Sequence, residues 1–130
     1  MTTAANHAAR ILLVEDDSLL REAFRLLLED VGYEVHEAGT AAEALRACAT
    51  APPALVLLDL GLPDRPGLDV ARELRRSPET RQTPVFALTG RVGAEERRAC
   101  LDAGCSAYLA KPVEPRTLLR RIDEVLGPAG

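Results

Sequence analysis

Short apolar runs alternate with amphipathic stretches along this chain from about residue 10 onward. The runs are too short for helices and predict five β-strands, at 11–14, 33–38, 54–58, 84–88 and 107–110. Apolar residues in the stretches that follow them recur at helical spacing and predict five helices, at 19–31, 40–50, 68–76, 94–103 and 115–126. Strands and helices therefore alternate strictly.

Residues with strong local preferences mark several helix ends. Gly32 and Gly104 each follow the last residue of a helical stretch, where glycine is common. Thr40 and Glu43 have the spacing of a capping box at the start of the second helix. Pro115 suits the first turn of the last helix. The predicted boundaries thus depend on side-chain chemistry as well as on periodicity.

The third apolar run, at 54–58, shows no polar alternation, which indicates a central parallel strand covered by helices on both faces. With the strict strand-helix order, this predicts an α/β domain with a parallel five-stranded sheet in an open three-layer sandwich. A length of 130 residues leaves room for a single domain. We expect it at 10–127, after a disordered lead at 1–9 and before a short tail at 128–130.

Composition and charge narrow the function classes. The formal net charge is -4 and the pI is about 5.2, so a broad basic surface is absent and no direct nucleic-acid ligand is expected. The first apolar run is too short for a signal peptide or a membrane span. Cys48, Cys100 and Cys105 lack the spacing of a zinc site or a disulfide framework. We therefore expect a cytoplasmic protein without membrane contact.

Polar residues stand where four of the predicted strands end. In chain order they are Glu15, Asp16 and Asp17 after the first strand, then Asp59, Thr89 and Lys111 after the third, fourth and fifth. In an open parallel sheet these ends meet at one edge, where ligands bind. Lys111 is also the only lysine among 16 lysine and arginine residues, which favours a specific use of its compact ammonium group.

Each of these residues also has a purely structural interpretation. Asp16 or Asp17 could cap the first helix, Asp59 and Thr89 could be turn residues, and a lysine before proline is commonly solvated. The arginine pairs at 75–76, 97–98 and 120–121 are predicted to be solvated helix faces rather than a site.

The combination of these residues favours a phosphoryl site. Clustered carboxylates repel one another unless a cation relieves the repulsion. Their oxygens suit Mg²⁺, which takes only one or two carboxylates from a protein. Mg²⁺ beside an ammonium and a hydroxyl group would stabilise a transferring phosphoryl group. We predict Asp59, at the end of the central strand, as the acceptor, and Asp16 and Asp17 as the metal-binding pair.

Four segments of the chain resemble the receiver domain of two-component response regulators. They are ILLVEDDSLLRE at 11–22, LVLLDLGLPDRPGLDV at 55–70, PVFALTG at 84–90 and AYLAKPVEP at 107–115. Their order and intervals match that family over about residues 10–127. The resemblance implies a single-domain (βα)5 flavodoxin-like sandwich with the strand order 2-1-3-4-5.

The resemblance also implies a role for each residue of the predicted metal site. Asp17 would be the direct metal ligand, and Asp16 would hold the ion largely through water. Asp59 would bind the metal and carry the phosphoryl group, and the main-chain carbonyl of Gly61 would be a further ligand. Gly61 and Arg91 stand where the family varies its rate of phosphoryl hydrolysis, so the phosphoryl lifetime stays open.

The same resemblance implies the groups that bind the phosphate and respond to it. Lys111 would ion-pair with the phosphate and form a cis peptide bond with Pro112. Thr89 would take a phosphate oxygen with its hydroxyl group, and Tyr108 would turn inward when Thr89 moves. The alternative for Tyr108 is an ordinary strand aromatic with its hydroxyl group in water.

The function implied by the resemblance is a phospho-accepting switch in a His-Asp phosphorelay, with Mg²⁺ as cofactor. A sensor histidine kinase or a histidine phosphotransfer protein would donate the phosphoryl group. Phosphorylation of Asp59 would then change which downstream protein binds the surface formed by 94–103, 107–110 and 115–126. No enzymatic activity is expected beyond the domain's own phosphotransfer and autodephosphorylation. The chain would be a stand-alone regulator or a receiver excised from a larger protein.

Two alternatives stay open. One is a receiver-like interaction module that is never phosphorylated, against which the intact set of acidic residues, Thr89 and Lys111 counts. The other is an aspartyl-phosphate phosphatase of the haloacid dehalogenase type, whose D-x-D-x-T pattern is absent at Asp59. A dinucleotide-binding protein is excluded because no G-x-G-x-x-G motif follows the first strand.

Overall fold

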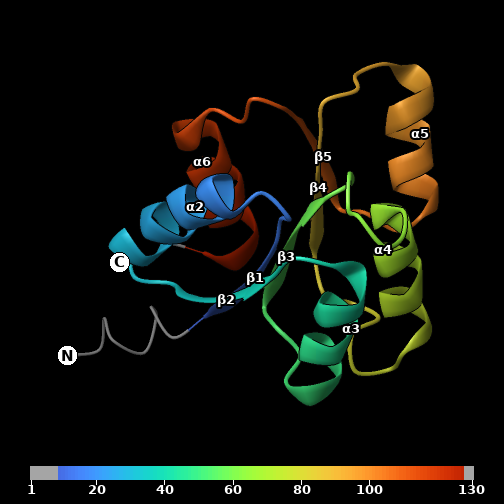
Figure 1. Cartoon of the computed structure of the whole chain (residues 1–130), viewed down its shortest axis with the longest axis horizontal. Coiled ribbons are helices and arrows are strands. Elements are labelled where there is room, and N and C mark those ends of the chain that lie inside the picture. The colour runs from blue at the N-terminus through green and yellow to red at the C-terminus, as the bar shows by residue number, and fades with distance from the viewer. Residues whose placement is uncertain (1–8, 128–130) are drawn as a thin grey trace.

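Five parallel strands form one sheet in the computed structural model, which describes residues 9–127 (Figure 1). The strands are β1 (Arg10–Val14), β2 (Glu34–Ala38), β3 (Leu55–Asp59), β4 (Val85–Thr89) and β5 (Ala107–Ala110). Their order is β2-β1-β3-β4-β5, and every neighbouring pair is parallel. The predicted fold class and strand order are therefore confirmed.

Helices cover both faces of this sheet. They are α2 (Ser18–Asp30), α3 (Ala41–Thr50), α4 (Gly67–Arg76), α5 (Ala94–Asp102) and α6 (Pro115–Leu126). Helices α2 and α6 lie on one face, and α3, α4 and α5 lie on the other (Figure 1). All boundaries of helices and strands fall within one residue of their predicted positions. None of the helices within residues 9–127 is both long and apolar enough to cross a membrane.

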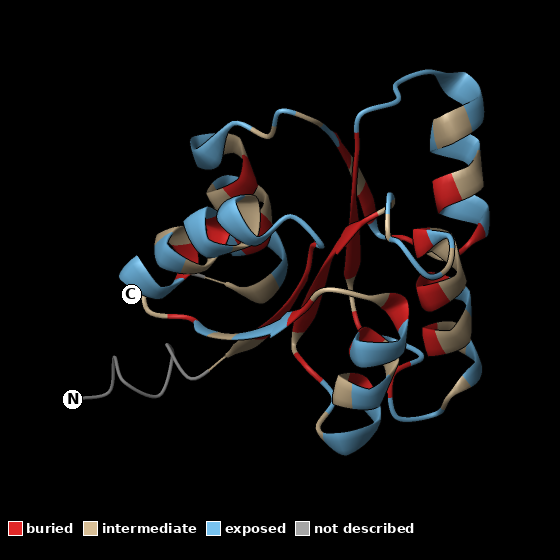
Figure 2. Cartoon of the chain, viewed as in Figure 1, coloured by how far each residue is buried: buried red, intermediate tan, exposed pale blue. Residues whose placement is uncertain are grey.

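Alternate residues of the central strands enter two separate cores. Ile11 and Leu13 of β1 pack with the apolar faces of α2 and α6, whereas Leu12 and Val14 pack with those of α3, α4 and α5. Figure 2 shows the central strands β1, β3 and β4 as mostly buried, the edge strand β2 as mostly exposed, and the helices as buried only along their inner sides. Burial on both faces explains why β1 and β3 show no polar alternation in the sequence.

The two predicted terminal segments lie largely outside the described residues, which exclude 1–8 and 128–130. Ala9, the last residue of the expected lead, is described. Its carbonyl oxygen accepts the N–H of Glu34 at 3.1 Å. Ala9 is therefore tied to the edge strand β2.

The start of α3 is capped from two directions. Thr40 Oγ1 accepts the N–H of Glu43 at 3.1 Å, as the capping box predicts. Glu43 Oε1 accepts the N–H of Gly39 at 2.7 Å, one residue before the position that a reciprocal capping box uses. The carboxylate of Asp64, in the β3–α4 loop, accepts the N–H groups of Ala41 and Ala42 at 2.9 and 3.0 Å. These bonds lower the pKa of Asp64 and tie the loop that follows Asp59 to α3.

The arginine pair on α4 differs from its predicted role. Arg76 is exposed, but Arg75 is half-buried and binds main-chain carbonyl groups. Its Nε and Nη2 donate to Gly104 O at 3.0 and 2.7 Å, and its Nη1 donates to the carbonyl oxygens of Thr80 and Arg81. The prediction of a solvated side chain is wrong for Arg75, because its planar fork bridges α4 to the turn after α5.

All three cysteines are buried and unpaired. Burial raises the pKa of the Cys48 thiol to about 11 and that of Cys105 to about 12, and the thiolate is the reactive form. We therefore expect the native protein at pH 8 to react with an aromatic disulfide reagent no faster than it unfolds. In guanidinium chloride all three thiols should react at once. Rapid modification of any thiol in the native protein would contradict this expectation.

Candidate functional site

A cleft of about 940 Å³ lies at the carboxyl ends of the strands. The loops that follow β1, β3, β4 and β5 line it. The structure thus brings together the six residues that leave the predicted strands, namely Glu15, Asp16, Asp17, Asp59, Thr89 and Lys111. They come from four separate parts of the sequence, and the parallel register of the strands carries all of them to one edge.

Asp59 and Lys111 form the central contact of the cleft. Lys111 Nζ donates to Asp59 Oδ1 at 2.7 Å and lies 3.6 Å from Glu15 Oε1. The N–H of Gly61 also donates to Asp59 Oδ1, at 3.3 Å. Glu15 and Asp59 are only 2% and 4% exposed, so two carboxylates and one ammonium group share a buried space.

Burial and charge shift the proton affinities of this group. Burial raises the pKa of Glu15, and the nearby charge of Asp59 raises it further, against the lowering effect of the Asp17 N–H. For Lys111, burial alone would lower the pKa, but the hydrogen bond and charge of Asp59, together with Glu15, outweigh it and raise the pKa. The ammonium form of Lys111 is therefore stabilised beside the two carboxylates.

The acidic residues that gather beside Asp59 are Glu15 and Asp16. One carboxylate oxygen from each of Glu15, Asp16 and Asp59 lies within 4.8 Å of the others. Asp17 also lines the cleft, but it is not part of this group. Its Oδ1 accepts the N–H groups of Leu19 and Leu20 at 3.0 and 3.1 Å, which makes it the N-cap of α2. In the structure Asp16 therefore shares the acidic group with Glu15, whereas the sequence pattern pairs Asp16 with Asp17.

A local signal in the sequence could have located this pair. A helix whose first apolar residues are Leu19 and Leu20 needs an N-cap just before Ser18, and Asp17 is the acidic residue in that place. An N-cap commits its carboxylate to the helix, which leaves Glu15 and Asp16 for the cleft. The helix-capping interpretation thus applies to Asp17, and the metal-binding interpretation applies to Glu15 and Asp16.

Thr89 and Tyr108 both form a hydrogen bond with the backbone of Arg91. Thr89 is 5% exposed, and its Oγ1 accepts the N–H of Arg91 at 3.0 Å. The hydroxyl group of Tyr108 donates to the carbonyl oxygen of Arg91 at 2.8 Å. Tyr108 is half-buried and turned towards the β4–α5 loop. The Lys111–Pro112 peptide bond is cis, as the resemblance implies.

The donor set of the cleft fits a hard divalent cation. Oxygen ligands of carboxylate and carbonyl type are those that Mg²⁺ prefers. Glu15 Oε1 is buried and has no hydrogen-bond partner among residues 9–127, and a buried carboxylate oxygen is costly to leave without one. Glu15, Asp16 and Asp59 could therefore hold Mg²⁺, and the charge of the ion would offset the repulsion among them.

Comparison with known proteins shows the family to which this chain, with its acidic cleft at the carboxyl ends of the strands, belongs. The model of the response regulator receiver domain family matches residues 11–123. The chain belongs to that family: it is a receiver domain of two-component response regulators. The family consists of signalling proteins that pair with histidine kinases, and it is not an enzyme family.

Two curated relatives illustrate the similarity. The transcriptional regulatory protein PmrA of Pectobacterium parmentieri is 42% identical over 117 residues, which are 90% of this chain and 52% of PmrA. The phosphate regulon transcriptional regulatory protein PhoB of Pseudomonas aeruginosa is 35% identical over 120 residues, which are 92% of this chain and 52% of PhoB. The chain thus spans about half the length of the curated relatives it matches.

Solved structures show the same fold. The chemotaxis response regulator CheY4 of Vibrio cholerae superposes with a TM-score of 0.86 at 29% identity, covering 91% of this chain and 98% of CheY4. The receiver domain of the sensor histidine kinase PA1611 from Pseudomonas aeruginosa superposes with a TM-score of 0.85 at 32% identity. That match covers 92% of this chain and 98% of the PA1611 domain, whose structure has a magnesium ion coordinated in the active-site cleft.

Proposed function

We propose that Asp59 accepts a phosphoryl group from a phosphohistidine of a sensor histidine kinase or a histidine phosphotransfer protein. The observation that carries this proposal is the contact of 2.7 Å between Lys111 Nζ and Asp59 Oδ1, in a cleft that also holds Glu15 and Asp16. A carboxylate that is to bond to phosphorus needs positive charge close by, because the incoming group is anionic. Lys111 supplies that charge from the end of β5.

We propose Glu15, Asp16, Asp59 and the main-chain carbonyl of Gly61 as the residues that hold Mg²⁺. The acidic group beside Asp59 and the magnesium ion in the PA1611 cleft support this assignment. The ligand role that the resemblance gives to Asp17 passes to Glu15, because the Asp17 carboxylate caps α2. When bound, Mg²⁺ would neutralise charge on the oxygens of the phosphoryl group.

The hydrogen bonds of Asp59 indicate which oxygen reacts. Both hydrogen bonds to its carboxylate within the described part of the chain reach Oδ1, from Lys111 Nζ and Gly61 N. Oδ2 is therefore the nucleophile in this proposal. Oδ2 bonds to phosphorus as the phosphorus–nitrogen bond of the phosphohistidine breaks, and the bonding pair returns to the imidazole nitrogen. Lys111 stays protonated and balances the charge of the new acyl phosphate.

Thr89 and Tyr108 transmit the change in this proposal. The acyl phosphate adds about two negative charges at the end of β3, and the Thr89 hydroxyl group turns to donate to it. Oγ1 then gives up the N–H of Arg91, whose carbonyl group also binds Tyr108. The Arg91 segment is released, Tyr108 moves into the space that Thr89 leaves, and the population shifts towards a second packing of the β4–α5 loop.

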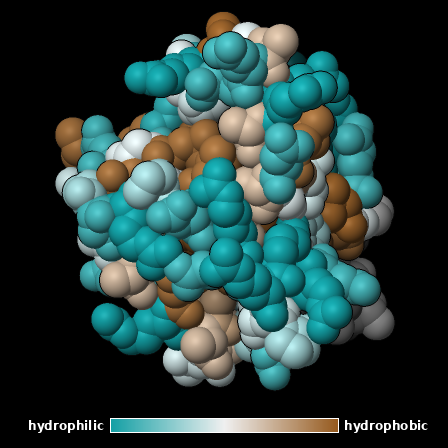
Figure 3. All heavy atoms as spheres, turned by 90° about the vertical axis from the view of Figure 1, so that its right-hand side faces the viewer, coloured by the Kyte–Doolittle hydropathy of each residue, from teal (hydrophilic) through white to brown (hydrophobic). Residues whose placement is uncertain are grey.

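The surface formed by α5, β5 and α6 is the proposed output face. Arg97 and Arg98 of α5 and Arg120 of α6 are exposed there, and the side of the molecule that carries α4 and α5 is mostly hydrophilic (Figure 3). Leu101 of α5 and Val125 of α6 are exposed as well, so these helices present both charged and apolar side chains, a composition that suits contact with a protein partner. We place the domain in the cytoplasm, because its three unpaired thiols suit a reducing compartment.

Intact-mass analysis after incubation with acetyl phosphate and MgCl2 tests the phosphoacceptor role. We expect one added phosphoryl group that hydroxylamine removes and that EDTA prevents from forming. Asp59→Asn should show no adduct, because the amide cannot attack phosphorus. An unmodified wild-type protein at every Mg²⁺ concentration would instead support the interaction module. Steady hydrolysis of a small phosphate ester would support the phosphatase.

A further inference from the structure

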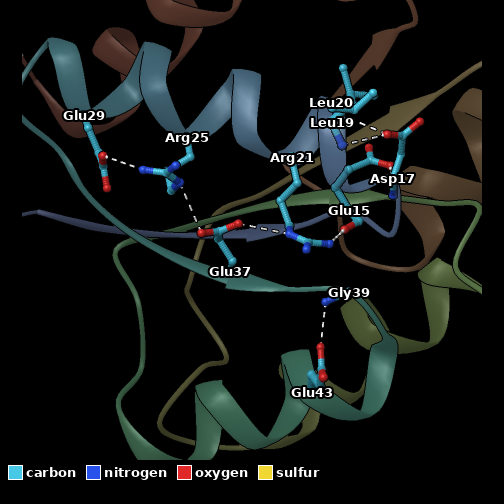
Figure 4. Close-up of polar contacts among 10 residues, drawn as sticks. All are labelled: Glu15, Asp17, Leu19, Leu20, Arg21, Arg25, Glu29, Glu37, Gly39 and Glu43. Atoms are coloured by element: carbon cyan, nitrogen blue, oxygen red, sulfur yellow. Dashed lines mark hydrogen bonds and ion pairs between the residues drawn. The ribbon is translucent and has the colours of Figure 1, made fainter.

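We propose that Arg21 is a positioning residue that fixes the β1–α2 loop, so that Glu15 and Asp16 face the cleft. This inference rests on the proposed function of those two carboxylates. Arg21 lies in the first turns of α2, and its guanidinium group reaches back across the loop (Figure 4). Among residues 9–127, the one hydrogen bond of this group to the loop goes to a main-chain oxygen, so it occupies no carboxylate oxygen of Glu15 or Asp16.

The contacts of Arg21 join three parts of the fold. Its Nη1 donates to the carbonyl oxygen of Glu15 at 2.7 Å, and its Nε donates to Glu37 Oε1 on the edge strand β2 at 3.0 Å. The guanidinium group is planar, so both bonds constrain its orientation at once. Arg21 thereby holds the β1–α2 loop against β2.

The bond to Glu15 O acts on both metal-binding carboxylates. That oxygen belongs to the peptide unit joining Glu15 to Asp16, which is planar, so fixing the oxygen fixes the plane from which both residues project. The same residue is held elsewhere: Glu15 N donates to Ala38 O at 2.9 Å, and Glu15 Oε2 accepts the N–H of Asp17 at 3.1 Å. Glu15 Oε1, 3.6 Å from Lys111 Nζ, has no hydrogen bond within the part of the chain that the structure describes.

Gly39 gives the guanidinium group its space. A Cβ atom at position 39 would lie 3.3 Å from Arg21 Nη1, closer than an ordinary van der Waals contact. The backbone of Gly39 does not require glycine, because its φ is not positive. A side chain at position 39 would therefore press on the guanidinium group where it approaches Glu15 O.

Arg25 offers a matched control on the same helix. Its Nε lies 3.3 Å from Glu37 Oε2, so it shares the partner of Arg21, and its Nη1 binds Glu29 at 3.1 Å (Figure 4). Neither contact reaches the β1–α2 loop. Arg21→Ala and Arg25→Ala each remove one exposed ion pair with Glu37, which contributes little to stability, but only the first removes the bond to Glu15 O.

Calorimetric titration with MgCl2 tests the inference. We expect Arg21→Ala to weaken Mg²⁺ binding about tenfold, the lower end of the effect of losing a group that orients a metal ligand. Arg25→Ala should bind Mg²⁺ like the wild type. Arg21→Lys should recover part of the affinity, because an ammonium group can donate to Glu15 O but cannot hold Glu37 in the same fork. In ¹H–¹⁵N spectra the amide signals of Asp16 and Asp17 should shift in Arg21→Ala and stay in place in Arg25→Ala.

The outcomes separate this inference from the proposed function. Wild-type protein that binds Mg²⁺, with Arg21→Ala binding it equally well, would overturn the role of Arg21 and leave the metal site standing. Wild-type protein that does not bind Mg²⁺ would overturn both. If Arg21→Ala does not fold, Gly39→Ala decides, since its Cβ would lie 3.3 Å from Arg21 Nη1 and shift the guanidinium group by a few tenths of an ångström, while it meets Glu15 O only at an ordinary contact distance of 4.0 Å. Weaker Mg²⁺ binding by that variant supports the inference, and unchanged binding refutes it.

Discussion

Asp16→Asn should weaken Mg²⁺ binding by more than about a hundredfold, whereas Asp17→Asn should leave it close to the wild-type value. Loss of a group that only orients a metal ligand already costs about ten- to a hundredfold in affinity, and Asp16 is proposed as a charged ligand itself. Asp17 holds the first turn of α2 instead, through two bonds to main-chain N–H groups. Asparagine caps a helix about as well as aspartate, so the second variant should also keep its stability.

The two variants form a matched pair, because the same atom is replaced in neighbouring residues. Calorimetric titration with MgCl2 measures the affinities, and thermal unfolding without metal checks the fold. Asp17→Ala serves as the control for the cap and should lose about 1 kcal/mol of stability while binding Mg²⁺ normally. If Asp17→Asn loses Mg²⁺ binding as severely as Asp16→Asn, Asp17 is the direct ligand that the family resemblance implies, and the assignment of Glu15 is wrong.

Gly67→Ala should lower the free energy of unfolding by about 3 kcal/mol, the upper part of the range for forcing an extra group into a packed core. A Cβ atom at position 67 would lie 2.6 Å from Leu60 Cα and 2.8 Å from Asp59 O. Both are main-chain atoms, so no side-chain rotation relieves the contact. The start of α4 or the end of β3 must move. The extent of phosphorylation of Asp59 should therefore decrease as well, because Asp59 is the last residue of β3.

Gly61→Ala and Gly90→Ala are the controls for this substitution. A Cβ atom at either position meets no atom of the described residues within 4 Å, and neither glycine has a positive φ. Each should stay within about 0.5 kcal/mol of the wild type. Urea unfolding followed by circular dichroism measures all three variants. Gly67→Ala with wild-type stability would mean that β3 and α4 can separate freely, contrary to the close approach seen here.

The fold was predictable because its signals are local and repeated. Strand β1 is apolar from Ile11 to Val14 and β3 from Leu55 to Leu58, since helices bury both faces of the sheet, and each helix shows its own periodicity. The contacts across the sheet are less visible in the sequence. Arg75 is one of many arginines, and nothing beside it in the chain indicates that its partners are Thr80, Arg81 and Gly104.

The sequence predicted which residues gather at the candidate site better than it predicted which acidic residues bind the metal. Parallel strands must bring their ends to one edge, so Asp59, Thr89 and Lys111 could be grouped from their positions alone. The choice between neighbouring acidic residues was harder, because one residue decides whether a carboxylate caps a helix or enters the cleft. Arg21 could not be found from the sequence, since its partner is a main-chain oxygen six residues earlier.

The hydrogen bonds from Ala41 and Ala42 to Asp64 join the β3–α4 loop to the start of α3. The β3–α4 loop is anchored at one end by the close packing of Gly67 and in its middle by two N–H groups of α3. A rearrangement of this loop would therefore move the first turn of α3 or break its hydrogen bonds to Asp64. That turn lies on the same face of the sheet as α5 but on the other side of α4 (Figure 1), so phosphorylation of Asp59 would change a second region besides the proposed output face.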